Sequence, residues 1–71
     1  MVVSFMVTLK ELNRYGIAQY VISSEEDVNT LNTKYVQGCK QGSTAEMPTL
    51  NGIRVWELCK TDEKTGQWYE L

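Results

Sequence analysis

Residues 23–28 read Ser-Ser-Glu-Glu-Asp-Val, and this stretch marks where the chain changes from strand to helix. Either Ser24 with Asp27 or Ser23 with Glu26 is typical of a helix start, because the serine oxygen can accept a hydrogen bond from a free backbone N–H group. The acidic residues also complement the positive end of the helix dipole. We therefore expect a helix that has Ser23 or Ser24 as its N-cap.

A stripe of apolar side chains continues from this start at helical spacing. Its members are Val28, Leu31, Tyr35, Val36 and Cys39, while asparagine, threonine, lysine and glutamine fill the opposite face. The spacing predicts an amphipathic helix of about four turns. Asparagine and threonine are indifferent helix formers, so packing of the apolar stripe must stabilise this helix.

Upstream of the helix, residues 3–9 alternate between apolar and polar side chains, which predicts a half-buried strand. Residues 17–22 form a second strand candidate, and residues 13–16 between them end in glycine, as turns often do. The simplest interpretation is a β-hairpin. The alternative is a short helix over residues 9–15 that would end at Gly16.

After the helix, residues 40–51 (KQGSTAEMPTLN) show no apolar period and contain the only proline, so we expect a loop. Residues 53–60 and 67–71 are strand candidates joined by the polar turn 61–66, which predicts a second hairpin. The expected fold class is α+β, in the order β-β-α-β-β. One amphipathic helix would pack on an antiparallel sheet in a single two-layer domain spanning residues 1–71.

The composition argues against catalysis. The 71 residues include no histidine and only two cysteines, which excludes Ser-His and Cys-His nucleophile pairs and a four-ligand zinc site. No secretion signal precedes the domain, so we expect Cys39 and Cys59 to be two reduced thiols, and a single Cys39–Cys59 disulfide is the alternative. The carboxylates of residues 25–27 would point about 100° apart on a helix and would not converge. We expect a non-enzymatic protein with no cofactor and no metal.

Charge and hydropathy indicate the environment of the protein. The net charge of −2 provides no basic field for double-stranded nucleic acid, so nucleic acid is not the partner that we expect. No apolar run approaches the length of a membrane span, and the N-terminal residues lack the basic start of a signal peptide. We therefore expect a cytoplasmic protein that does not associate with membranes.

The aromatic residues are the candidates for a binding site. Their large rings are many for a domain with one thin core, and a single helix covers only one face of a sheet. Arg54 has the same parity as Trp56 on its strand, so a strip of aromatic and basic residues results if that parity faces outward. The candidate partner-binding residues are Arg54, Trp56, Trp68, Tyr69, Tyr15 and Tyr20.

These features predict a small non-catalytic module that docks on a host or cognate protein as an inhibitor or adaptor, and a homodimer is compatible with this. The alternative is binding of single-stranded nucleic acid by stacking on an aromatic sheet face. The chain resembles small phage-encoded accessory or inhibitor proteins in its size, in the hairpin that leads into residues 22–28, and in the closing hairpin from residues 51–53 to 67–69. That resemblance implies a host polymerase, nuclease or defence complex as the target and assigns no functional residue.

Overall fold

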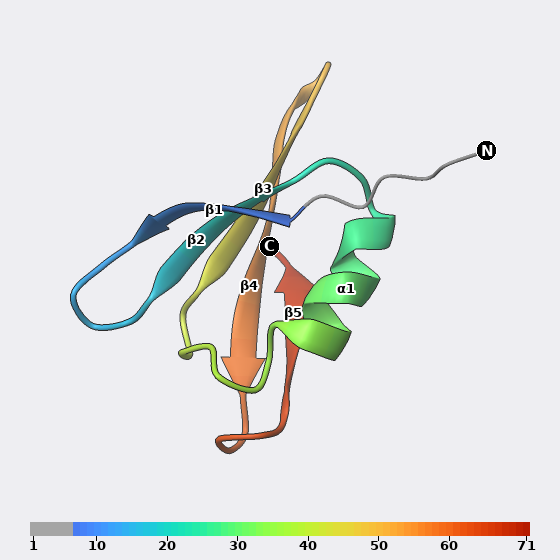
Figure 1. Ribbon diagram of the computed structural model, residues 1–71. Coiled ribbons are helices and arrows are strands. Elements are labelled where there is room, and N and C mark those ends of the chain that lie inside the picture. Colours follow the sequence, from blue (N-terminus) through green and yellow to red (C-terminus); the bar gives the residue numbers. More distant parts are fainter. Residues whose placement is uncertain (1–6) are drawn as a thin grey trace.

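The computed structural model describes residues 7–71, which form a five-stranded sheet with a helix packed against it (Figure 1). In chain order the elements are β1 (Val7–Leu12), β2 (Ala18–Ile22), α1 (Glu26–Lys34), β3 (Thr44–Thr49), β4 (Gly52–Lys60) and β5 (Gly66–Glu70). The α+β class is confirmed. The predicted order β-β-α-β-β is incomplete, because a further strand lies between α1 and β4. Residues 3–6 of the first predicted strand lie outside the described residues.

The first hairpin is confirmed, since β1 pairs antiparallel with β2. In its turn, the Asn13 side chain accepts hydrogen bonds from the backbone N–H groups of Tyr15 at 2.8 Å and Ile17 at 3.1 Å. Gly16 has a φ of +83°, which glycine adopts without strain. The alternative helix over residues 9–15 is wrong, because so short a helix is unstable alone and the strand residues gain a cross-strand ladder.

The helix starts one or two residues later than predicted, because its N-cap is Glu25 and not Ser23 or Ser24. No side chain caps α1 at its N-terminus. Instead, the carboxylate of Asp27 turns back, and its Oδ2 accepts hydrogen bonds from the N–H groups of Ser23 at 2.8 Å and Ser24 at 3.1 Å. The Ser23 hydroxyl donates to the same oxygen at 3.0 Å. The first helical turn is thereby tied to the end of β2.

The helix is shorter than the sequence predicts. It ends at Lys34, and Tyr35 already has a φ of −120°. Tyr35 and Val36 still pack in the core, so the apolar stripe continues after the helix has ended. Two causes shorten the helix: its asparagines and threonines favour helix weakly, and Gly38, at a φ of +89°, redirects the chain before Cys39.

The predicted loop over residues 40–51 is wrong, because it contains β3. This strand pairs in parallel with β2 and antiparallel with β4, so the sheet is mixed and not antiparallel as predicted. A helical connection between neighbouring strands is what allows them to run parallel. Pro48 concealed the strand, since proline lacks the N–H group that a sheet interior needs. It is tolerated because the pairing of β3 with β2 ends at Glu46, before the proline.

The sheet curls around the helix. Its strand order is β1-β2-β3-β4-β5, and α1 makes most of its backbone contacts with the sheet at the two edge strands, β1 and β5, rather than at β2, β3 and β4 between them. The edges therefore approach the helix more closely than the centre does, and the inner face of the sheet forms a trough. Large side chains fill this trough. The buried core comprises Ile22, Leu31, Val36, Ala45, Met47, Trp56, Leu58 and Trp68.

Candidate partner-binding surface

Both candidate tryptophans lie in the core, where Trp56 is 5% and Trp68 is 2% exposed. The indole N–H of Trp68 donates to the carbonyl of Tyr35 at 3.2 Å. Beside them, the Tyr20 and Tyr35 rings pack edge to face with their centroids 5.0 Å apart. The trough of the curled sheet is deep enough for these rings. Trp56 and the other β4 residues on its side of the strand therefore point inward, toward α1.

Tyr20 is a partly buried residue of the same inner face. Its hydroxyl lies 3.6 Å from Sγ of Cys39. Burial, reinforced by the hydrogen bond to the thiol, raises the pKa of the Tyr20 hydroxyl well above its ordinary value. Tyr20 therefore stays neutral at physiological pH and contributes to packing between the sheet and the segment that follows α1.

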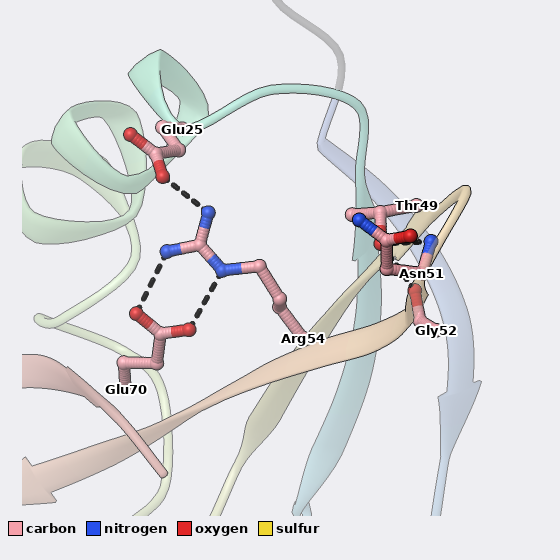
Figure 2. Close-up of polar contacts among 6 residues, drawn as sticks. All are labelled: Glu25, Thr49, Asn51, Gly52, Arg54 and Glu70. Carbon is pink, nitrogen blue, oxygen red and sulfur yellow. Dashed lines mark hydrogen bonds and ion pairs between the residues drawn. The ribbon is translucent and has the colours of Figure 1, made fainter.

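Arg54 lies at one end of the inner face and joins three elements, as Figure 2 shows. Its guanidinium forms a bidentate pair with Glu70 of β5 at 2.7 Å and 2.8 Å, and it also donates to Glu25 at the start of α1. The guanidinium carbon lies 4.9 Å from the centre of the Trp56 ring. We call this group of Arg54, Glu25 and Glu70 the arginine clamp.

The arginine clamp neutralises the charge that Arg54 could offer to a partner. The hydrogen bonds to Glu70 and then to Glu25 raise the pKa of Arg54, and the bond from Arg54 lowers the pKa of Glu70. The Glu25 and Glu70 side chains are 67% and 41% exposed, so water and salt weaken both ion pairs. The clamp orients β4, β5 and α1 and presents more negative than positive charge at the surface.

Tyr15 is exposed, but it lies on the β1–β2 turn. Its side chain is 65% exposed, the Arg14 guanidinium lies 5.0 Å from the centre of its ring, and that guanidinium also donates to its hydroxyl at 2.9 Å. The strand β1 is one edge of the sheet and β5, which carries Tyr69, is the other. The two exposed candidate tyrosines are therefore at opposite edges of the sheet.

Tyr69 belongs to the outer face, which is the surface of the sheet that points away from α1. Successive residues of a strand point to opposite faces, so the neighbours of Trp56 in β4 point outward. On this face Ile53 is 61%, Tyr69 53% and Leu71 77% exposed. The Leu71 N–H donates to the carbonyl of Val55 at 2.9 Å, which aligns their side chains. These residues form a continuous apolar strip across β4 and β5, consisting of Ile53, Val55, Tyr69 and Leu71.

Charged side chains border the apolar strip. Glu46 of β3 lies opposite Val55, and Glu57 of β4 lies opposite Tyr69. The Lys10 ammonium of β1 donates to Glu46 at 2.7 Å, a hydrogen bond that raises the pKa of Lys10. Because Lys10 offsets Glu46, the carboxylate of Glu57 leaves the border of the strip acidic.

Two depressions lie beside α1 and the segment after it. The first has a volume of about 250 Å³ and is lined by the arginine clamp with Val28, Asn29 and Trp56. The second has a volume of about 320 Å³ and is lined by Gly38, Cys39, Lys40, Gln41, Lys60 and Glu63. In the second, the Lys60 ammonium donates to the carbonyls of Cys39 and Glu63, at 2.8 Å each, and so joins two loops.

Two properties of residues 7–71 bear on other kinds of site. No group of three or more His, Cys, Asp or Glu residues in this range is placed to hold a metal ion. No helix in the same range is long and apolar enough to cross a membrane.

No protein-family model, curated protein or solved structure matches this chain. Sequence reasoning included Tyr69 but missed Ile53 and Val55. The alternation of side chains along β4 could have identified them. Trp56 and Leu58 are the bulkier set and fit a core, so the residues between them, on the other face of the strand, point outward.

Proposed function

We propose that this protein is a non-catalytic binding module that docks its outer face on a partner protein, as an inhibitor or adaptor. The observation that carries the proposal is the apolar strip, which no residue of the described range covers. Ile53, Tyr69 and Leu71 each expose more than half of their surface. A contiguous exposed patch that includes an aromatic ring is typical of protein interfaces.

The shape of the outer face favours a concave partner. Because the sheet curls around α1, its outer face is convex. Two convex surfaces touch over a small area, whereas a stable interface buries about 800 Å² on each partner. We therefore propose that the occupant of this face is a cleft on a larger protein and not a second copy of the chain.

The charges around the apolar strip favour a protein over single-stranded nucleic acid. Nucleic-acid binding needs exposed rings for base stacking together with a basic groove. The rings of Trp56 and Trp68 pack inside, and Glu57 makes the border of the strip acidic. A cleft with an apolar floor and a weakly basic rim complements this arrangement.

A matched pair of tyrosine variants tests the proposal. The resemblance to phage-encoded inhibitors makes host polymerases, nucleases and defence complexes the first partners to assay after affinity capture with the wild type. We expect Tyr69→Ser to raise the Kd for the captured partner at least about tenfold, because it removes the aromatic anchor of the strip. Tyr15→Ser removes a similarly exposed ring from the opposite edge and should change Kd by less than about twofold.

Titration calorimetry with the purified partner measures both constants, and circular dichroism checks that both variants remain folded. Equal effects of the two substitutions would place the interface elsewhere than on the outer face. Binding that survives Tyr69→Ser unchanged would lead to the same conclusion.

A further inference from the structure

We infer that the tip of the β3–β4 hairpin anchors this interface, and that Leu50 inserts into an apolar pocket of the partner protein. The inference rests on the proposed function, because it assigns a second point of contact with the same partner. Leu50 is a fully exposed leucine at the end of a projecting, internally hydrogen-bonded hairpin.

The hairpin projects beyond the rest of the sheet (Figure 1). Pairing of β3 with β2 ends at Glu46, and the last backbone hydrogen bond from the C-terminal strand reaches Val55. Pairing between β3 and β4 continues for three further residue pairs, until Thr49 lies opposite Gly52. At about 3.3 Å per residue, the hairpin extends roughly 10 Å past its neighbours. Its tip is therefore free to enter a cavity in another molecule.

Leu50 lies at the end of this hairpin and is fully exposed to solvent. Turn positions usually hold glycine, asparagine, aspartate or proline, because those residues favour turn conformations. Nothing in the local geometry of the turn calls for a leucine. The whole apolar surface of this side chain is available to a partner, and its burial there would be favourable.

The turn around Leu50 is held by hydrogen bonds that do not involve its side chain. The Thr49 hydroxyl donates to the carbonyl of Gly52 at 2.7 Å and accepts from the N–H of Asn51 at 3.2 Å (Figure 2). Gly52 has a φ of +131°, which other residues rarely adopt. At the base of the hairpin, the arginine clamp fixes β4 to α1 and β5. A loop that is ordered before binding loses little entropy when it binds.

The chemistry of the tip defines the pocket that fits it. Residues 47–53 carry no charge, and Pro48 and Ile53 are exposed beside Leu50. Ile53 also begins the apolar strip, so the tip and the strip form one continuous surface. The base of the hairpin carries the excess negative charge of the arginine clamp, which disfavours approach to an anionic membrane. An apolar pocket at the end of a weakly basic protein cleft fits these features.

A second matched pair of variants tests the inference. Leu50→Ser should raise the Kd for the purified partner at least about tenfold, mainly through faster dissociation. Leu12→Ser is the control, because Leu12 is also an exposed leucine, at 59%, on a different strand; it should change Kd by less than about twofold. Surface plasmon resonance measures both, and the melting temperature of Leu50→Ser should match that of the wild type.

The outcomes separate this inference from the proposed function. If Leu50→Ser binds like the wild type while Tyr69→Ser binds weakly, the tip is not an anchor and the outer-face proposal still holds. Equal losses in Leu50→Ser and Leu12→Ser also overturn the inference. Binding to phosphatidylserine vesicles that is lost in Leu50→Ser would overturn the inference, because it would show that the tip inserts into a membrane and not into a protein pocket. A wild-type chain that captures no partner would overturn both the inference and the proposed function.

Discussion

Asp27 is a fully buried carboxylate at the junction between β2 and α1. Its Oδ2 accepts three hydrogen bonds from Ser23 and Ser24, while Oδ1 has no hydrogen-bond partner among the described residues. Burial of a carboxylate is costly unless hydrogen bonds offset the loss of water. The three bonds on Oδ2 therefore decide whether this residue stabilises the fold.

Replacing Asp27 with alanine removes the acceptor for two backbone N–H groups, so Asp27→Ala should lower the free energy of unfolding by about 2 kcal/mol. Asp27→Asn keeps one acceptor oxygen and should lose less. Urea denaturation at neutral pH, followed by tryptophan fluorescence, measures both values. Equal losses in the two variants would show that the hydrogen bonds are not the cause.

At the scale of residues, the position of the helix start was predictable from residues 23–28, but the acceptor was not. Ser24 could have capped the helix, or Asp27 could have bonded back to Ser24, because both arrangements use the same short segment. The packing of α1 onto the sheet buries Asp27, and a single sequence does not contain that information. The same packing decides that Trp56 faces inward.

At the scale of elements, the arginine clamp connects α1, β4 and β5. Arg54 lowers the pKa of Glu70 in the folded state below its unfolded value of about 4.5. The stability that this ion pair contributes is therefore present above pH 4.5 and is lost as pH falls through the lower folded pKa. Glu70 is exposed and Arg54 is only half-buried, so added salt should weaken the effect.

Removing the guanidinium tests this linkage. Arg54→Gln should have a lower melting temperature at neutral pH, and the difference from the wild type should shrink between about pH 5 and about pH 2. Arg14→Gln is the matched control, since the structure gives Arg14 no carboxylate partner among residues 7–71, and it should show no such pH-dependent difference. The pKa of Asp62, lowered by hydrogen bonds from the N–H groups of Lys64 and Thr65, affects all three proteins alike. A constant difference for Arg54→Gln across this range would contradict the linkage.

The sequence predicted the first hairpin, β4 and β5 because each shows its alternation within a few residues. It did not predict β3, although Ala45 and Met47 alternate there with Glu46 and Pro48. The proline and the neighbouring glycine, serine and threonine are typical of a loop. The parallel pairing of β3 with β2 depends on contacts between distant parts of the chain, and local patterns do not report them.

At the scale of the whole molecule, the curl of the sheet explains which rings are buried. A flat sheet under one helix would have a thin core, and the sequence alone suggested that some of the aromatic rings would lie outside it, as Tyr15 and Tyr69 do. The closer approach of β1 and β5 to α1 deepens the inner face, so Trp56 and Trp68 both fit. The same curl makes the outer face convex and leaves Tyr69 on that face, where Val55 and Leu71 separate it from Ile53.

The measurement that most directly tests whether the outer face is the interface is methyl cross-saturation NMR on the labelled protein bound to its unlabelled partner. We predict that signal loss concentrates on the methyl groups of Ile53 and Val55, because these residues would lie against the partner. The methyl groups of Ile22, on the inner face, serve as the internal reference and should keep their intensity. Signal loss confined to Leu9 and Leu12, with Ile53 and Val55 unaffected, would contradict the proposed interface.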